Sequence, residues 1–437
     1  MRPNLGAGFR GVNAALSTPV ENSVERVWTA SSPLWNTTGR PGYDAVDTAT
    51  AARHRSPLTC DDAGAQGVHE KFPTEEAPVD QTSAGVEAAT PGEPLGPVAA
   101  LRRIAFLLER RLADTYKVKA FRGAVNTLLR LTPDELDRRC AEGTLQELEG
   151  IGKATAAVVL DAHAGRVPAY LADLEGTAGP LVEGGDTLRP LLRGDLHSHS
   201  DWSDGGSPIE EMVMTAVELG REYQALTDHS PRLKVARGLS VERLRRQLEV
   251  VDGINAHLSS GGTFRLLKGI EVDILDDGGL DQTEEMLGRL DVVVASVHSK
   301  LRMEAGPMTR RMVAAVRNPH VDVLGHCTGR LVRGGRGTRP QSEFDAAAVF
   351  AACAEHQVAV EINSRPERQD PPDDLIALAV DAGCLFSIDT DAHAPGQLDF
   401  LQYGAARAEA AGVPPDRVVT TWPLERLLEW TGRRRPS

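Results

Sequence analysis

The sequence is poor in aromatic residues, and none of its cysteines lie close together in the sequence. Aromatic side chains make up 4% of the 437 residues, so a buried core must consist mainly of Ala, Val, Leu and Ile. The five cysteines are widely spaced and never form a CxxC pair, which argues against a disulfide framework and against a thiolate zinc site. Cys327, next to His326, is expected to be a packing residue.

Long apolar runs and an excess of positive charge are also missing. No run reaches the length of a membrane span, and the first thirty residues lack the basic and apolar layout of a signal peptide. The net charge of −14 argues against a nucleic-acid-binding surface over the whole chain, although a local basic patch stays open. We therefore expect a soluble cytoplasmic protein with no membrane partner and no obligate protein partner.

Changes in composition divide the chain into four segments. Residues 1–96 are rich in Pro, Gly, Ser and Thr without apolar periodicity, so they are predicted to be disordered. An alternative is that the true start codon lies near residue 96 and that this segment is an upstream extension. Residues 97–175 predict a small all-α domain, residues 176–190 a glycine-rich linker, and residues 191–437 a larger α/β domain.

The small domain combines helical periodicity with a glycine hairpin. Apolar residues recur at helical spacing in "PVAALRRIAFLLERRLADTY", and residues 101–130 hold eight basic against two acidic residues, which predicts a positive face. The stretch "LEGIGKATA" resembles a helix-hairpin-helix motif, in which Gly150 and Gly152 turn the chain and leave backbone N–H groups for a phosphate. An ordinary helix-turn-helix packing unit is the alternative.

From residue 191 onward, short apolar runs alternate with helical segments. Runs such as "YQALTDH", "DVVVASVHS" and "CLFSIDTDAH" read as buried parallel strands. The stretch "SPIEEMVMTAVELG" predicts a helix that opens with a capping box from Ser207 to Glu210, has Pro208 at its first position and closes at Gly220. The repeated units predict an α/β barrel or a doubly wound sheet.

Six histidines and three carboxylates fall at or just beyond the carboxyl ends of these predicted strands. In a barrel, those ends form the face where active sites lie. Imidazole and carboxylate suit divalent ions such as Zn²⁺ and Mn²⁺, and nine ligands are too many for one ion. We therefore expect two or three Zn²⁺ or Mn²⁺ ions, with Mg²⁺ or Fe²⁺ as alternatives. The candidate ligands are His197, His199, Asp204, His229, Glu271, His298, His326, Asp391 and His393.

The successive motifs "DLHSHSDWSDG", "TDHS", "GIEVD", "SVHS", "GHCTGR" and "DTDAH" resemble those of the polymerase and histidinol phosphatase (PHP) superfamily of phosphoesterases. The resemblance covers roughly residues 191–430 and implies a distorted (βα)7 TIM-like barrel with a trinuclear site. It implies one ion at His197, His199, Glu271 and Asp391, a second at Glu271, His298 and His326, and a third at Asp204, His229 and His393.

The small domain is similar to the DNA-end-binding domain of family X DNA polymerases, whose bacterial members also carry a PHP domain. Only about thirty residues separate Ala164 from Asp195, so the polymerase core is absent. The resemblance implies that Lys117 binds the 5′-phosphate of a DNA end. It places Thr144 where relatives with lyase activity have a Schiff-base lysine, and threonine cannot form an imine. The expected DNA-binding residues are Lys117, Arg122, Gly150, Gly152 and Lys153.

Several residues next to the ligands are candidates for catalysis. Arg330, just past His326, is the best candidate to grip a phosphate, while Arg333, Arg336 and Arg339 fit either that role or a solvated loop. Asp195, Asp228 and Asp273 flank ligands and either orient histidines or cap strand ends. A metal cluster can activate a hydroxide and clamp a phosphate ester without a Ser or Cys nucleophile.

The sequence thus predicts a metal-dependent phosphoesterase acting on DNA ends, as a 3′-5′ exonuclease or a 3′-end phosphatase with a place in DNA repair. A phosphatase for small phosphorylated molecules, of histidinol-phosphatase type, is one alternative. A non-catalytic DNA-end-binding adaptor is the other.

Overall fold

The two periodicities of the sequence produce two kinds of structure, a helical segment followed by a parallel barrel. The computed structural model describes residues 93–259, 262–335 and 337–433. The disorder predicted for residues 1–96 therefore falls, apart from residues 93–96, outside the described residues, as does Arg336.

The helical segment consists of short amphipathic helices around an apolar core. Its elements are α2 (Pro97–Arg110), α3 (Thr115–Leu128), α4 (Pro133–Glu142), the 3₁₀ turn η2 (Leu145–Glu147), α5 (Lys153–His163) and α6 (Ala169–Gly176). Leu101 and Ile104 of α2 are buried against Phe121 and Val125 of α3 and Val159 of α5, as their helical spacing predicts.

The first helix is shorter than the apolar pattern suggests. α2 ends at Arg110, and Leu112 has a φ of 52° and is 41% exposed. The Asp114 side chain then accepts a hydrogen bond from the N–H of Tyr116 and begins α3. The predicted run through Tyr116 is therefore two helices and a turn.

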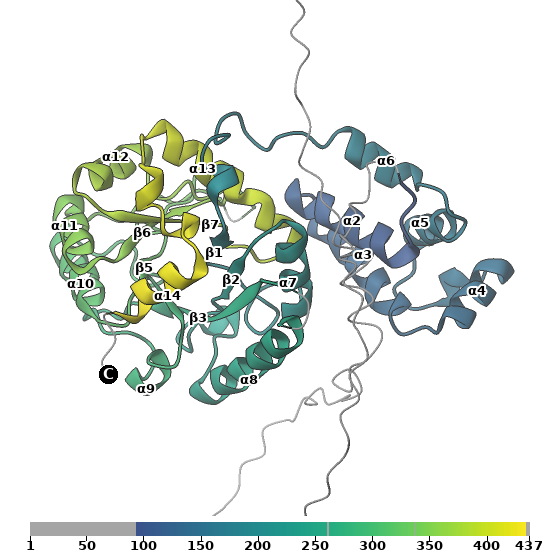
Figure 1. Cartoon of the computed structure of the whole chain (residues 1–437), viewed down its shortest axis with the longest axis horizontal. Helices are drawn as coiled ribbons and strands as arrows, with labels where there is room; N and C mark the ends of the chain where they lie inside the picture. Colours follow the sequence, from purple (N-terminus) through teal and green to yellow (C-terminus); the bar gives the residue numbers. More distant parts are fainter. Residues whose placement is uncertain (1–92, 260–261, 336, 434–437) are drawn as a thin grey trace, which may run out of the picture. The chain divides into compact units, whose positions relative to one another are not determined.

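Seven parallel strands form the second part, in the order of the sequence (Figure 1). They are β1 (Gly194–Asp195), β2 (Tyr223–Leu226), β3 (Arg265–Asp273), β4 (Val292–Ser296), β5 (Val323–Leu324), β6 (Ala359–Asn363) and β7 (Leu385–Asp389). A parallel bridge between Ser198 and Ala392, just past β1 and β7, joins the two edges. The sheet is therefore a nearly closed barrel, the first of the two predicted architectures.

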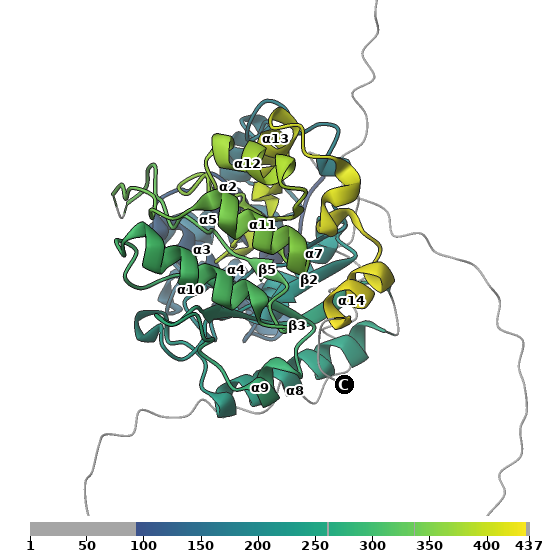
Figure 2. The same cartoon turned by 90° about the vertical axis from the view of Figure 1, so that its left-hand side faces the viewer.

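Helices follow the strands and surround the sheet (Figure 1). They are α7 (Ile209–Glu218), α8 (Val241–Leu258), α9 (Glu284–Leu287), α10 (Ala305–Arg317), α11 (Ala346–His356), α12 (Asp373–Asp381), α13 (Leu401–Ala410) and α14 (Leu424–Gly432). The 3₁₀ turns are η3 (Arg189–Leu191), η4 (Lys234–Ala236), η5 (Pro395–Phe400), η6 (Pro415–Arg417) and η7 (Val419–Thr421). Helices α10, α11 and α12 lie side by side on one side of the barrel (Figure 2).

The start of α7 corrects the predicted capping box. Pro208 is the N-cap residue, with no side-chain cap, and the helix begins at Ile209. The glycine stop was predicted correctly, because Gly220 lies just beyond the helix with a φ of 72°.

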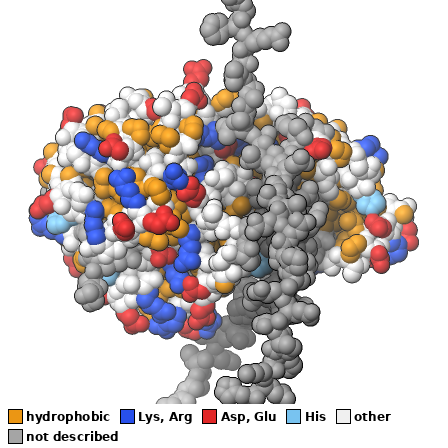
Figure 3. Space-filling model, in the orientation of Figure 1, with side chains coloured by type: hydrophobic (Ala, Val, Ile, Leu, Met, Phe, Trp, Pro, Cys, Tyr) orange, Lys and Arg blue, Asp and Glu red, His pale blue; other side chains and the backbone are white. Residues whose placement is uncertain are grey.

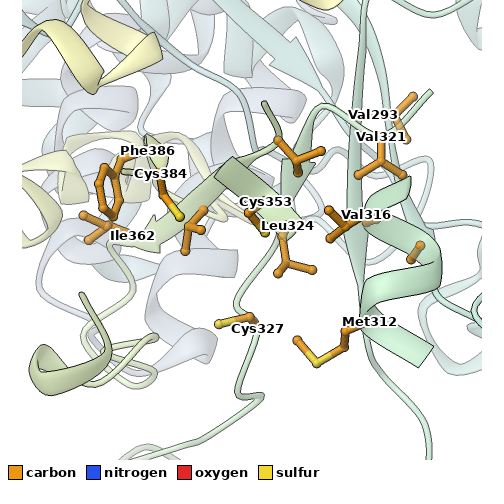
Figure 4. Close-up of a cluster of buried hydrophobic side chains, with 14 of the residues drawn as sticks. Val293, Met312, Val316, Val321, Leu324, Cys327, Cys353, Ile362, Cys384 and Phe386 are labelled. Atoms are coloured by element: carbon orange, nitrogen blue, oxygen red, sulfur yellow. The ribbon is translucent and has the colours of Figure 1, made fainter. Parts of the chain in front are cut away.

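The barrel core is aliphatic, as the shortage of aromatic residues requires. Cys327, Cys353 and Cys384 are buried within it and form no disulfide, and Figure 4 shows them among aliphatic side chains such as Leu324 and Ile362. Burial raises the pKa of the Cys327 thiol well above its ordinary value. The prediction that Cys327 is a packing residue is confirmed.

The glycine-rich segment before the barrel is bound along α13. The Glu409 carboxylate accepts hydrogen bonds from the N–H groups of Gly185 (2.9 Å) and Thr187 (2.7 Å). A Cβ at Gly185 would lie 2.9 Å from the backbone nitrogen of Ala406, so this position requires glycine. The C-terminal part of the predicted linker is therefore anchored to helix α13 of the barrel.

The described surface carries charges of both signs. On the face in Figure 3, Lys and Arg side chains alternate with Asp and Glu without a large area of one sign. Among the described residues, no helix combines the length and hydropathy needed to span a membrane.

Candidate metal centre

The carboxyl ends of the strands bring all nine predicted ligands to one place. In a parallel barrel these ends share one face, so loops distant in sequence meet there. The site receives His197 and His199 after β1, Asp204 before α7, His229 after β2, Glu271 on β3, His298 after β4, His326 after β5, and Asp391 and His393 after β7.

Glu271 lies at the centre of the cluster. It is 1% exposed, and its two carboxylate oxygens face five histidines. Oε2 lies 2.8 Å from His229 Nδ1, 3.4 Å from His197 Nε2 and 3.6 Å from His199 Nε2. Oε1 lies 2.8 Å from His326 Nε2 and 3.2 Å from His298 Nε2. A carboxylate in this position can bridge ions held by different histidines.

A second group forms around Asp204 at the edge of the cluster. Its Oδ1 lies 3.4 Å from Nε2 of both His229 and His393. The His199 ring is stacked on that of His229, with centroids 4.5 Å apart, and is tilted against that of His393, with centroids 4.3 Å apart. Ligand atoms of these four residues all lie within 4.8 Å of one another.

The unpaired polar atoms of this cluster suit divalent cations. Nε2 of His197, His199, His298 and His326 and both oxygens of Glu271 are buried without a hydrogen-bond partner. Each such orphaned atom would cost about 1–3 kcal/mol of stability. Histidine nitrogen and carboxylate oxygen are the donors that Zn²⁺ and Mn²⁺ accept. The donor set therefore fits metal ions.

Carboxylates behind the cluster orient two of the histidines. Glu361 Oε1 lies 2.6 Å from His197 Nδ1, with both side chains fully buried. Asp273 forms a short hydrogen bond to His298 Nδ1. A carboxylate that accepts the Nδ1 proton leaves Nε2 as the ring atom that can bind a metal ion. Asp273 thus has the orienting role that the sequence allowed.

Burial and neighbouring charge set the protonation of the site. Burial, with the charges of His393 and His229, lowers the pKa of His199 to about 3, so this ring is neutral at physiological pH. Neutral imidazole is the form that binds a metal. Burial lowers the pKa of His229, but the Glu271 charge and the Asp204 hydrogen bond outweigh it and raise the pKa to about 10.

Asp195 and Asp228 hold the backbone rather than the ligand rings. Asp195 accepts hydrogen bonds from the N–H groups of His197 (3.1 Å) and Thr390 (3.2 Å), and burial raises its pKa to about 6. Asp228 accepts from the N–H of Ser200 at 2.9 Å. Both carboxylates fix the backbone of the loop that carries His197 and His199. Of the two roles that the sequence left open, this corresponds to capping a strand end and not to orienting a histidine ring.

Arg330 does not point its charge at the cluster. Its guanidinium donates to the carbonyl oxygens of Arg368 (3.2 Å) and Gln369 (2.8 Å), so it braces the loop after β6. The arginines that reach the cluster come from that loop. Arg368 Nε donates to Asp391 Oδ2 at 2.9 Å, and the Arg365 guanidinium lies 2.9 Å from His393 Nδ1.

The sequence reasoning missed Arg365, Arg368 and Glu361. The signal in the sequence is their position within and just past "QVAVEINS", another apolar run of the kind that predicts a buried strand. This strand supplies no histidine, so a pattern of histidines at strand ends does not reveal it.

The predicted DNA-binding residues differ in what the structure leaves available. Lys117 and Lys153 are exposed. Arg122 is not available, because its guanidinium pairs with Glu109 at 2.8 Å and with Glu211 of α7 at 3.0 Å and its side chain is 12% exposed. Arg103 and Arg110 are also in ion pairs, so the predicted positive face is smaller than the residue count suggests.

The hairpin itself has the expected turn but fewer open amides. Gly150 has a φ of 86°, and Gly152 is the N-cap residue of α5. The N–H of Ile151 donates to Leu148 O, and that of Gly152 donates to Thr155 Oγ1 at 3.0 Å. The N–H groups of Ile151 and Gly152 thus have partners inside the chain, which leaves fewer hairpin amides for a phosphate than expected.

Comparisons with known proteins agree with both parts of the chain. Residues 195–365 match the PHP domain, and residues 96–164 match a helix-hairpin-helix domain. The chain is 39% identical over 217 residues to the DNA polymerase/3′-5′ exonuclease PolX of Bacillus subtilis, which covers 50% of this chain and 37% of the relative. It is also 28% identical over 251 residues to the probable phosphatase YcdX of Escherichia coli (strain K12). This alignment covers 55% of this chain and 94% of the relative.

Among solved structures, the histidinol phosphate phosphatase of Lactococcus lactis, complexed with zinc, L-histidinol and phosphate, aligns with a TM-score of 0.38 and 18% identity over 51% of this chain and 94% of that one. The chain spans about a third of the length of the PolX relative and nearly all of the YcdX relative.

The chain therefore carries a PHP domain preceded by a helix-hairpin-helix domain, as its motifs predicted. Together with the phosphatase relatives, the PHP match supports a metal-dependent phosphoesterase, which is a hydrolase.

Proposed function

We propose that this chain hydrolyses phosphate esters with two or three divalent metal ions, Zn²⁺ or Mn²⁺, held by the nine residues of the cluster. The observation that carries the proposal is the convergence of these side chains around Glu271, with buried nitrogens that have no hydrogen-bond partner. When bound, such ions polarise the phosphate ester and lower the pKa of an attacking water.

The protein residues would supply orientation and charge. Glu361 and Asp273 hold two histidines in the tautomer that leaves Nε2 free. Arg365 and Arg368 place two cations beside His393 and Asp391, where they would bind oxygens of the substrate phosphate and offset the charge that develops in the transition state. Asp195 holds the backbone of His197 in place.

We further propose DNA ends as the substrate, with cleavage as a 3′-5′ exonuclease or a 3′-end phosphatase. The helix-hairpin-helix match and the similarity to a DNA polymerase/3′-5′ exonuclease support this choice. Lys117, Lys153 and the N–H groups at the start of α5 would contact DNA phosphates.

A small phosphorylated molecule is the second candidate substrate. The similarity to the probable phosphatase YcdX spans 94% of that relative and favours this alternative. The small-molecule reaction would need the cluster and its arginines but not Lys117 or Lys153.

The test is a hydrolysis panel with the purified chain and added Zn²⁺ or Mn²⁺. It compares a 3′-recessed duplex, single strands and phosphorylated metabolites, each before and after removal of metal by a chelator. Metal-dependent hydrolysis of the DNA substrates is expected. Hydrolysis of the metabolites alone would favour the second candidate substrate. If none of the substrates is hydrolysed, a non-catalytic DNA-end-binding adaptor becomes the better interpretation.

A further inference from the structure

Two adjoining cavities lie beside the metal cluster and are lined by arginines. One has a volume of about 300 Å³ and the other about 150 Å³, and they share Leu331 and Arg368. Five arginines line the pair against one carboxylate, Glu367. These arginines are Arg302, Arg333, Arg339, Arg365 and Arg368.

Arg368 connects the cavities to the metal centre. Its Nε donates to Asp391 Oδ2 at 2.9 Å, and its side chain is 12% exposed. Arg365, which lines the smaller cavity, reaches His393. A group bound at the cluster is therefore next to the cavity walls, with the two arginines between them.

Two outer arginines, Arg302 and Arg333, keep their charge available for a ligand. Arg302 is exposed and, among the described residues, has no ion-pair or hydrogen-bond partner. Arg333 donates through Nε to the carbonyl oxygen of Pro366 (3.0 Å). A carbonyl fixes a guanidinium in place but does not neutralise it, so the cavity attracts an anion.

We infer that these cavities bind the non-scissile phosphate that neighbours the scissile one in an oligonucleotide. The inference rests on the proposed function, because it assumes that the cluster takes the scissile phosphate. A monoester metabolite has one phosphate, and that phosphate would bind at the cluster and Arg365. Only a substrate with a second phosphate close to the first uses the arginines on the outer wall.

The test compares two substrates that differ by one flanking phosphate. Full-length protein with Mn²⁺ is assayed on a trinucleoside diphosphate and on a dinucleoside monophosphate, and the ratio of their kcat/KM values is measured. A wild-type ratio of about ten is expected, which corresponds to one charged hydrogen-bonded contact. Arg302→Ala should bring this ratio close to one, and Arg302→Lys should keep part of it.

Arg317→Ala is the matched control, since Arg317 is an exposed arginine in the last turn of α10 and lines neither cavity. It should keep the wild-type ratio. The KM for the trinucleotide should also depend less steeply on salt in Arg302→Ala, by about 0.7 in the log–log slope for one single-strand phosphate contact.

A wild-type ratio near one, or an unchanged ratio in Arg302→Ala, would overturn the inference while hydrolysis of the dinucleotide keeps the proposed function intact. Failure to hydrolyse either substrate would instead overturn the exonuclease form of the proposed function, on which the inference rests. A nucleoside 3′,5′-bisphosphate is the third substrate. If it depends on Arg302 and the trinucleotide does not, the cavity serves a small bisphosphate and the inference is wrong.

Discussion

A single buried carboxylate organises the candidate site at the scale of residues. Glu271 is surrounded by five histidines, and the charges of His298, His229 and His197 outweigh its burial and hold its pKa well below the ordinary value. Burial alone would raise that pKa, so the neighbours decide the result. An ionised carboxylate in the protein interior needs a balancing positive charge, which metal ions bound by neutral histidines would supply in place of protonated rings.

Substituting Glu271 by Gln should therefore abolish the metal cluster with little change in volume. We expect the metal content to fall below the two to three ions per chain predicted for the wild type, and activity to fall by orders of magnitude. Elemental analysis and hydrolysis of a chromogenic phosphodiester measure the two effects. Glu285→Gln, an exposed glutamate on α9, is the matched control and should change neither. Near-normal activity in Glu271→Gln would place the reaction elsewhere.

Glu361 should act on the metal through His197. Removing its charge with Glu361→Gln should weaken metal binding about 10- to 100-fold, because the imidazole becomes a poorer donor. Metal titrations of activity measure the apparent Kd, and excess metal should restore the rate. Glu355→Gln, an exposed glutamate on α11, is the control. A lower rate that excess metal does not restore would contradict this role.

At the scale of elements, the sequence predicted the strands and their ends better than the contacts between distant segments. The candidate ligands could be found because parallel strands share one end, so "VVVASVHS" and "SIDTDAH" reach the same face. The ion pairs of Arg122 could not be predicted, because a charge is visible in a sequence and its partner is not. Glu211 lies 89 positions away, and only the fold brings it to 3.0 Å.

The hairpin before α5 depends on glycine at one position only. Gly150 has a φ of 86°, and a Cβ there would lie 3.1 Å from Thr127 Oγ1. Gly150→Ala should lower the stability of this turn by about 1–2 kcal/mol. Hydrogen exchange of the α5 amides should show faster local opening. Gly123→Ala, in the open interior of α3, should instead raise stability by about 0.5–1 kcal/mol. Equal effects of the two substitutions would contradict the argument.

At the scale of the whole molecule, ion pairs join the helical segment to the barrel. Arg122 pairs with Glu211 of α7, and Arg110 pairs with Asp399 of η5 at 2.6 Å. The Glu109 carboxylate also accepts a hydrogen bond from the N–H of Gly396 at 2.8 Å. Deleting the helical segment would remove these contacts and expose the face of the barrel that they cover, so the stability of the barrel would change together with DNA binding. A truncation therefore cannot separate DNA binding from folding, whereas exposed lysines can be changed singly.

Replacing Lys117 and Lys153 together by Ala should weaken DNA binding while sparing the metal centre. Each lost phosphate contact should reduce the slope of log affinity against log salt by about 0.9, so the double variant should lose about 1.8. The measurement is the ratio of activity on a 3′-recessed duplex to activity on a chromogenic phosphodiester, at two salt concentrations. Lys234→Ala, an exposed lysine in η4 of the barrel, is the control and should keep the wild-type ratio. An unchanged ratio in the double variant would mean that these lysines do not present DNA to the barrel, and the phosphatase for small molecules would become the better interpretation.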